Sequence, residues 1–199
     1  MANKPGKTFR LAALIIIALL AICFYTSYNS LVLKQEQVTK TWNNVQSDYQ
    51  RRVDLVPNLV STVKQSSEYE KDVLVKLTEA RAKAATVNVS GDASYENYKK
   101  TEAANSEVAI AANRVIAVIE KYPDVKTTKA FLRLQDQLEG TERRIKFSRK
   151  DFNEAVMGYN KAVRSFPASI AAKLFGFKTK EGFTADMGTD KTPEINFTK

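Results

Sequence analysis

The 199-residue sequence contains no histidine, a single cysteine, seven glycines and five prolines. The missing imidazole excludes His-based general bases, Ser-His and Cys-His nucleophile systems and most zinc sites. One cysteine excludes an intramolecular disulfide framework. No glycine stands in a GxxxxGK, GxGxxG or GxSxG loop. We therefore expect a protein that is not an enzyme and that needs no cofactor and no metal.

The scarcity of glycine and proline also leaves few positions at which a helix must end. The length suits one domain plus an anchor, and long helices are expected. With 31 basic and 22 acidic residues the formal net charge is +9, and no RNA- or DNA-binding motif accompanies it. A mildly basic chain without such a motif predicts no nucleic-acid partner.

One apolar run dominates the N-terminal part of the sequence. Residues Leu11 to Tyr25 (LAALIIIALLAICFY) carry no charge, and the tolerable stretch extends over residues 9–28. About 20 residues are needed to cross the hydrocarbon core of a bilayer. A signal peptide would need a small-residue cleavage site, and the residues before Ser27 do not provide one. We therefore predict one uncleaved transmembrane anchor that contacts the bilayer through this run.

Charges beside the apolar run predict its orientation. Cationic flanks tend to remain in the cytoplasm, so the side with more lysine and arginine close to the span is the cytoplasmic side. The N-terminal side is richer in such residues, which predicts a cytoplasmic N-terminus and a domain on the opposite side of the membrane. The cations nearest the run are Lys4, Lys7 and Arg10 before it, and Lys34 and Lys40 after it.

Apolar residues at three- and four-residue steps predict helices after the anchor. The first runs from about residue 28 to residue 52 and continues the anchor with little interruption. Pro57 disfavours helical geometry at the residue before it and removes an amide donor, so residues 53–57 should break the helix. With Asp54 as N-cap, a second helix would run over residues 55–84. The alternative is one long helix with a kink at this point.

Two further long helices follow. Residues 87–93 are turn-like, and Ser94 caps a third helix that ends at Tyr122-Pro123. Asp124 then caps the longest helix, over residues 125–165. A short helix over residues 169–175 ends at Gly176.

The longest predicted helix carries the clearest repeat in the chain. Large side chains at one seam position and mostly small ones at the other would let a neighbouring helix approach closely, as in a coiled coil. At seven-residue intervals stand Phe131, Leu138, Ile145, Phe152, Tyr159 and Phe166, and three residues after the first five come Leu134, Thr141, Ser148, Ala155 and Ala162.

These elements predict an all-α fold in which an N-terminal transmembrane helix precedes an antiparallel four-helix bundle with long helices. The chain divides into a short basic segment (1–8), the anchor (9–28), the helical bundle domain (29–177) and an extended or disordered tail (178–199).

A series of short motifs runs through the chain. They are YNSLV from Tyr28, WNN from Trp42, RRVDLVPNLV from Arg51, YPD from Tyr122, LQDQL from Leu134 and FP at Phe166. In this combination and order, over residues 28–177, they resemble the LemA family of bacterial membrane proteins. The resemblance implies a single span in the bacterial cell (inner) membrane, a four-helix domain and no defined biochemical role. Val53 stands where the family pattern usually has a histidine.

Arg52 falls on the apolar seam of the first helix, in a seven-residue series with Leu31, Val38, Val45 and Leu59. One interpretation is that Arg52 is buried against a carboxylate, Asp54 or Glu142, and fixes the register of the helices. The simpler interpretation is that the seam ends at Arg52.

A cluster of cations lies on the longest helix and forms an edge away from the apolar seam. It could bind anionic lipid headgroups or an acidic partner, or it could be a solvated outer face, which is the commoner case. The residues of this basic edge are Arg143, Lys146, Arg149 and Lys150.

The carboxylates of the same helix are the nearest approach to catalytic chemistry. Glu139 and Glu142 have the spacing of a catalytic acid pair, and Asp136 and Glu139 have the spacing of two metal ligands. Charged residues at such spacings on a long helix are more often simply solvated surface residues. Four aromatic residues towards the C-terminus either pack back on the bundle or mark an interaction site. They are Phe166, Phe175, Phe177 and Phe183.

Together these features favour a non-enzymatic, membrane-anchored scaffold or adaptor that self-associates or binds another envelope or membrane protein. The alternative is a lipid-binding or membrane-shaping protein that uses the basic edge. A hydrolase based on carboxylates ranks last.

Overall fold

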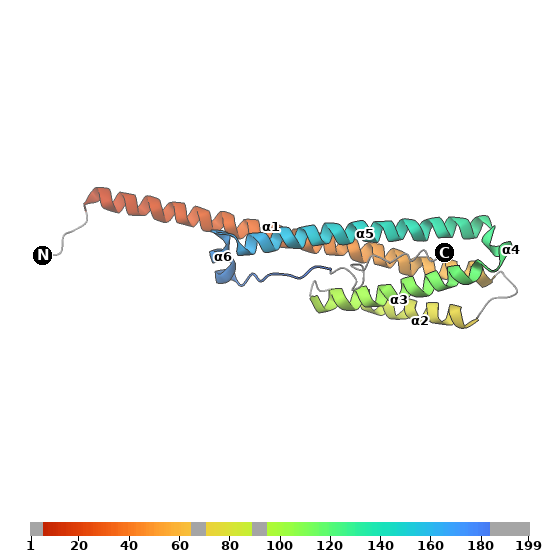
Figure 1. Cartoon of the computed structure of the whole chain (residues 1–199). Helices are drawn as coiled ribbons and strands as arrows, with labels where there is room; N and C mark the ends of the chain where they lie inside the picture. The colour runs from red at the N-terminus through yellow and green to blue at the C-terminus, as the bar shows by residue number, and fades with distance from the viewer. Residues whose placement is uncertain (1–5, 65–70, 89–94, 184–199) are drawn as a thin grey trace, which may run out of the picture.

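The computed structural model describes residues 6–64, 71–88 and 95–183, and within these ranges the structure is helical without a strand. The helices are α1 (Lys7–Lys64), α2 (Lys71–Asn88), α3 (Tyr95–Ile119), α4 (Pro123–Lys126), α5 (Lys129–Arg164) and α6 (Ala168–Phe175). Consecutive long helices run in opposite directions along a rod (Figure 1). The predicted all-α class is confirmed.

Helix α1 is one continuous helix of 58 residues, about 87 Å at 1.5 Å per residue, and it contains Pro57. The predicted break at residues 53–57 and the predicted second helix over 55–84 are therefore wrong, and the continuous helix of the alternative is what the structure shows. Proline removes one backbone hydrogen bond and crowds the carbonyl of Val53. The buried side chains of Val53, Val56 and Leu59 all point into the core around this position. Tertiary packing of that face outweighs the local cost of the proline.

Helices α2 and α3 form a hairpin beside the part of α1 that lies farthest from the N-terminus (Figure 1). Helix α2 extends through Val87 and Asn88, which were predicted to be in a turn. The rest of that turn and the Ser94 cap lie outside the described residues. Helix α3 begins at Tyr95 and ends at Ile119, close to the predicted bounds.

The predicted helix over 125–165 is two helices. Pro123 begins the short α4, because a proline at the first helical position lacks only an amide that would be unpaired anyway. Thr128 then caps α5, and its hydroxyl accepts a hydrogen bond from the Phe131 amide at 3.2 Å. The cap at Asp124 is thus replaced by one at Thr128, and α1 is the longest helix.

The large-small seam of α5 faces α1. Four of the six large seam residues are buried, namely Phe131, Ile145, Phe152 and Tyr159. Three of the five residues at the other seam position are buried as well, namely Leu134, Thr141 and Ser148. They meet the buried face of α1 in a core rich in aromatic rings. This seam is occupied within the chain. The buried α5 residues are Phe131, Leu134, Thr141, Ile145, Ser148, Phe152, Val156 and Tyr159.

The chain turns back after α5. Helix α6 ends at Gly176, whose φ of 76° lies in the left-handed region that favours glycine. Residues 177–183, here called the strap, then run back along α5 (Figure 1). The remainder of the predicted tail, residues 184–199, lies outside the described residues.

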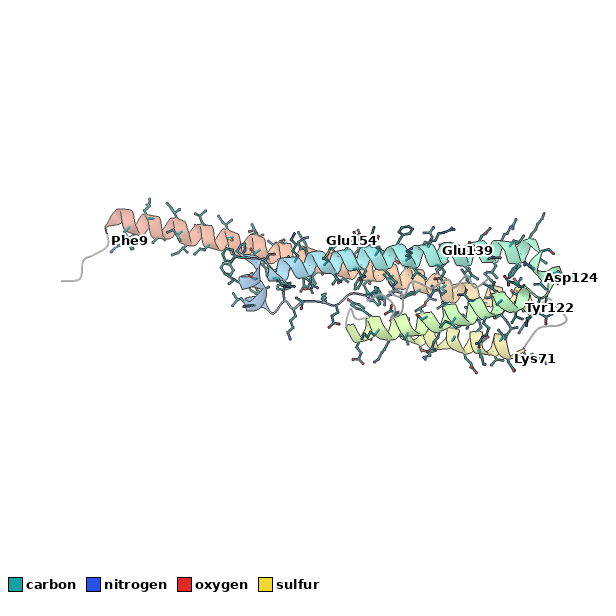
Figure 2. All side chains as sticks on the ribbon, viewed as in Figure 1. Phe9, Lys71, Tyr122, Asp124, Glu139 and Glu154 are labelled. Carbon is teal, nitrogen blue, oxygen red and sulfur yellow. The ribbon has the colours of Figure 1, made fainter. Side chains whose placement is uncertain are left out.

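The N-terminal part of α1 extends beyond the other helices, and its side chains project into open space (Figure 2). Leu14, Ile17 and Leu20 are each more than half exposed. Among the described residues, α1 is the one helix long and apolar enough to cross a membrane. An isolated apolar helix of this length favours the predicted anchor.

Candidate functional site

The carboxylates of α5 do not form a catalytic pair. Glu139 is exposed and accepts a hydrogen bond from Gln135, whereas Glu142 contacts Arg52 of α1. Asp136 is exposed, and the described residues contain no group of three ligands that could hold a metal ion. Of these three carboxylates, Glu142 is the one for which the structure gives a contact with another helix.

Arg52 joins three helices. Its side chain is 6% exposed, and its guanidinium pairs with the Glu142 carboxylate and donates to the backbone oxygen of Asn105 on α3 at 3.0 Å. The structure thus brings Arg52 and Glu142 together. Asp54 lies elsewhere and accepts a hydrogen bond from Gln50 at 2.8 Å. The seam of α1 continues past Arg52, because Leu59 is buried.

A second ion pair lies beside the first. Arg149 of α5 pairs with Glu102 of α3, and both side chains are about three-quarters buried. The Arg149 guanidinium also lies 4.5 Å from the centre of the Phe183 ring. Arg149 therefore points into the bundle and does not belong to the exposed basic edge.

Tyr49 of α1 lies among these two ion pairs. Burial raises the pKa of Tyr49 from 10.0 to about 12, and the nearby charges of Arg149 and Glu102 act on it in opposite directions. A phenol in this environment remains neutral at physiological pH. Tyr49 thus fills the core between the ion pairs and does not supply an acid or base there.

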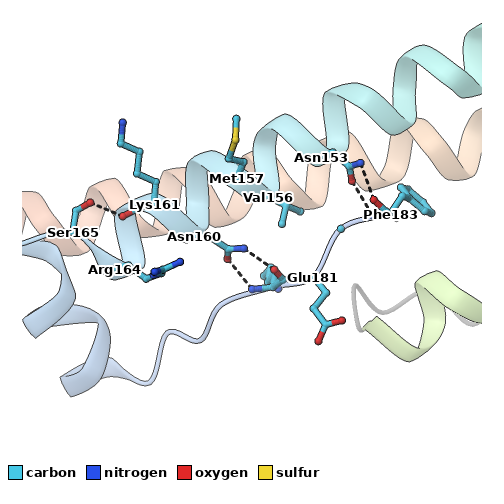
Figure 3. Close-up of a pocket in the computed structure, with 11 residues that line it drawn as sticks. Asn153, Val156, Met157, Asn160, Lys161, Arg164, Ser165, Glu181 and Phe183 are labelled. Carbon is cyan, nitrogen blue, oxygen red and sulfur yellow. Dashed lines mark hydrogen bonds between the residues drawn. The ribbon is translucent and has the colours of Figure 1, made fainter. Parts of the chain in front are cut away.

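Two asparagines of α5 bind the strap through its backbone (Figure 3). The Asn160 amide donates to the Lys180 carbonyl at 2.7 Å and accepts from the Lys180 amide at 2.8 Å. Asn153 makes the same pair of bonds with Phe183, at 3.0 and 2.8 Å. The asparagines stand seven residues apart, so both side chains point to the same face of α5.

The end of the strap is fixed by close packing. A Cβ on Gly182 would lie 2.5 Å from the Asn153 side-chain oxygen, so the close approach requires glycine. Phe183 packs 5.3 Å from the Phe152 ring and 6.0 Å from Trp42. Sequence analysis missed this site, although the two asparagines at a seven-residue spacing beside the α5 seam were its available signal.

The remaining basic edge is a different kind of surface. Arg143, Lys146 and Lys150 are exposed, and Lys150 lies 3.6 Å from Glu154 on the same helix. Phe147 stands among these cations and is 63% exposed. Sequence analysis did not single out Phe147, although it interrupts a run of charged residues.

The distance between this edge and the predicted anchor can be estimated from residue positions along α1. Arg52, which pairs with Glu142, is 24 residues beyond residue 28. At 1.5 Å per residue this is about 36 Å. Lys150 lies eight residues nearer along α5 and therefore remains about 24 Å from the anchor. These distances apply when α1 stands along the bilayer normal.

Comparison with known proteins gives one family and a set of relatives. The sequence model of the LemA family matches residues 41–197, which reaches further into the tail than the motifs over 28–177. Magnetosome proteins MamQ 1 and MamQ 2 of Paramagnetospirillum magneticum are each 24% identical to this chain over 206 residues, which cover 92% of this chain and 75% of theirs. MamQ of Magnetospirillum gryphiswaldense is 25% identical over 189 residues, which cover 84% of this chain and 70% of its own.

Proposed function

This chain belongs to the LemA family, and we propose that it is a non-enzymatic scaffold or adaptor that is anchored by α1 and binds proteins through the outer face of α5. In this proposal the chain forms an antiparallel four-helix bundle on one span of the cell (inner) membrane. The N-terminus is cytoplasmic and the domain lies on the other side. Its partners are further copies of the chain or another envelope or membrane protein.

The observation that carries the proposal is Phe147. An aromatic side chain that is 63% exposed, with Arg143, Lys146 and Lys150 around it, has the composition of a binding hot spot with a charged rim. The cations would steer an acidic surface towards the ring, and the ring would supply the buried contact. This chemistry fits an acidic patch on a protein.

The distance from the anchor favours a protein partner over the lipid alternative for this edge. Charges in physiological salt are screened over about 8 Å, whereas Lys150 lies about 24 Å beyond the anchor. Headgroups of the chain's own bilayer would therefore exert little attraction on the edge. A protein anchored in the same membrane can extend to this height.

The continuous α1 supports a scaffold role. Because the helix runs unbroken from the anchor into the core of the domain, the outer face of α5 is held at a set height above the bilayer. Anchoring in one plane raises the effective concentration of neighbouring molecules, so a modest lateral contact is sufficient for assembly. The α5 seam already packs on α1, so assembly would use the outer face.

The experiment is affinity capture of full-length protein from its own membrane in mild detergent, with the wild type compared with Phe147→Ala. We expect Phe147→Ala to lose associated copies or partners by about ten-fold or more, the effect of a hot spot worth about 2 kcal/mol. Met157→Ala is the matched control, because Met157 is a 66% exposed apolar residue on the same helix. Equal capture by all three proteins would contradict the proposal.

A further inference from the structure

An exposed apolar surface surrounds α6. Phe166 is 82% exposed, Leu174 71%, Phe175 54% and Ile170 47%, although α6 also contributes Ala171 and Ala172 to the core. These four large apolar side chains come from the eight-residue helix α6 and the turn before it. So many exposed apolar side chains in one short segment are rare on the surface of a soluble protein. We call Phe166, Pro167, Ile170, Leu174 and Phe175 the α6 lobe.

The lobe lies against the predicted anchor. A groove of about 290 Å³ separates the two, and its α1 wall is formed by Leu20, Cys23, Phe24 and Ser27. The opposite wall is Phe166, Pro167 and Ile170 of the lobe. The lobe therefore continues the apolar surface of the helix that would contact lipid.

The depth of the lobe follows from its contacts with α1. Tyr28, at the end of the predicted span, packs against Phe175 with the ring centres 4.8 Å apart. Leu20, the residue of the groove that lies farthest towards the N-terminus on α1, is eight residues before Tyr28. At 1.5 Å per residue this places the deepest part of the lobe about 12 Å below the end of the span.

The segment that contains the lobe is rich in cations, and the nearest acidic residue after it, Glu181, lines one cavity with Lys161, Arg164 and Lys180. Residues 155–180 contain five cations and no aspartate or glutamate. Lysine and arginine beside an apolar surface extend their long stems along it and place their charges at the headgroups, where anionic lipids attract them. The five cations are Lys161, Arg164, Lys173, Lys178 and Lys180.

The geometry points to a second membrane contact: the α6 lobe inserts among the acyl chains of the leaflet on the domain side, beside the span of α1. Phe166, Ile170 and Leu174 occupy the boundary of headgroups and acyl chains, as an interfacial helix does. Because α1 is continuous, the domain turns together with its span, and a single span can still rotate about the bilayer normal. Insertion of the lobe fixes which face of the rod is turned towards the bilayer and which neighbours α5 meets.

This inference shares only the anchor with the proposed function, and a test that uses the purified chain keeps the two separate. Trp42 is the single tryptophan and lies 14 residues beyond residue 28, about 21 Å above the bilayer. In the full-length wild type, Trp42 fluorescence therefore serves as a reference from a position outside the acyl chains. A second tryptophan can then report on the position to which it is added.

The experiment measures fluorescence quenching in vesicles of phosphatidylcholine and phosphatidylglycerol whose acyl chains carry bromine near the headgroups. The reporters are Phe166→Trp and Leu174→Trp, and the matched control is Phe147→Trp, an exposed phenylalanine on the outer face of α5. We expect about two-fold quenching of the added emission for both reporters, because interfacial side chains reach about 5–10 Å into the bilayer boundary. The control and the wild type should keep their emission.

Quenching of Phe166→Trp no greater than that of Phe147→Trp would overturn the inference. Efficient cross-linking of a Cys23→Ser, Phe166→Cys chain to itself, together with absent quenching, would assign the lobe to contact between copies and would also overturn it. Because these side chains are exposed, the helical circular dichroism of every variant should match that of the wild type. Loss of partner capture by Phe147→Ala would be unaffected by either outcome.

Discussion

The two halves of the rod are built differently. In the half far from the anchor, α1, α2, α3 and the start of α5 share a core of valine, leucine and alanine. In the half near the anchor, only the start of α3 reaches α1 and α5, where Tyr98 packs against Trp42 and Phe152 (Figure 1). There the strap and α6 cover the long pair, and the core contains aromatic rings. Both halves use packing between helices, and the near half adds asparagine side chains that bind the backbone of the strap.

Polar contacts lie where the two halves meet. Arg52 with Glu142 and Arg149 with Glu102 connect α1, α3 and α5 close to the start of α3. We expect each pair to favour one register of the helices, because a shift along α5 would leave a buried guanidinium without its carboxylate. The following variants test this division, from the largest expected effect to the smallest.

Glu142→Ala should have the largest effect, because it leaves the buried Arg52 guanidinium without its carboxylate. We expect a loss of about 3 kcal/mol in the free energy of unfolding, at the lower end for a broken buried pair since Glu142 is 53% exposed. Urea unfolding of the full chain in detergent, followed by Trp42 fluorescence, measures it. Glu139→Ala, on the exposed face, should change stability by less than about 0.5 kcal/mol. Equal effects would show that the pair does not hold the register.

Alkaline pH should destabilise the near half through Tyr49. Its pKa is raised to about 12 in the fold, whereas the unfolded side chain titrates near 10.0. The folded state therefore binds more protons between these values, so its stability is unaffected below pH 10 and falls as pH rises from 10 to about 12. The loss should reach about 3 kcal/mol.

Tyr49→Phe should remove most of this alkaline loss, and unfolding curves at several pH values between 9 and 12 would measure the difference from the wild type. Tyr159→Phe is the control, because burial raises the pKa of Tyr159 as well but less strongly. An alkaline transition that is unchanged by Tyr49→Phe would show that another group controls it.

Pro57→Ala tests the continuity of α1 in the far half. Within a helix, proline costs about 3 kcal/mol relative to alanine, part of which local adjustment recovers. Since Pro57 is exposed and α1 is unbroken around it, we expect the substitution to stabilise the protein by about 1 to 2 kcal/mol. A proline in the first turn of a new helix would instead make the substitution neutral or destabilising, and thermal unfolding separates the two.

Gly182→Ala should have a smaller effect, confined to the strap. The added Cβ meets the Asn153 oxygen and would displace Phe183 from the aromatic core, at a cost of about 1 kcal/mol. Faster proteolysis near Lys180, with the far half unchanged, is the expected result. Gly158→Ala is the matched control, because a Cβ there meets no atom within 4 Å. Identical digestion patterns would contradict the account of the strap.

Sequence periodicity predicted the parts of this fold that repeat along a helix. The seam of α5, the bounds of α3 and the stop at Gly176 follow from apolar spacing and from backbone preferences of single residues. The effect of Pro57 was predicted wrongly, because its local cost is outweighed by the burial of Val53, Val56 and Leu59. That burial depends on packing against other helices, which the spacing of apolar residues does not reveal. The Thr128 cap competes with Asp124, and sequence gives no means to rank two good caps.

The site was harder to predict than the fold. Arg52 could be assigned to the seam, but the choice between Asp54 and Glu142 depends on how two helices are placed in space. The strap has no periodicity, so its position depends on Asn153 and Asn160 binding backbone groups 30 and 20 residues away in sequence. Arg149 was placed on the basic edge, yet it turns inwards to Glu102, a partner on another helix.

The central claim is that this chain works by assembly at a membrane. The most direct test is the mass and composition of the full-length protein extracted from its own membrane, measured on single particles and by mass spectrometry. We predict particles that contain several copies of the chain, or the chain with another membrane or envelope protein in fixed ratio. A population of lone monomers without a partner would contradict the claim.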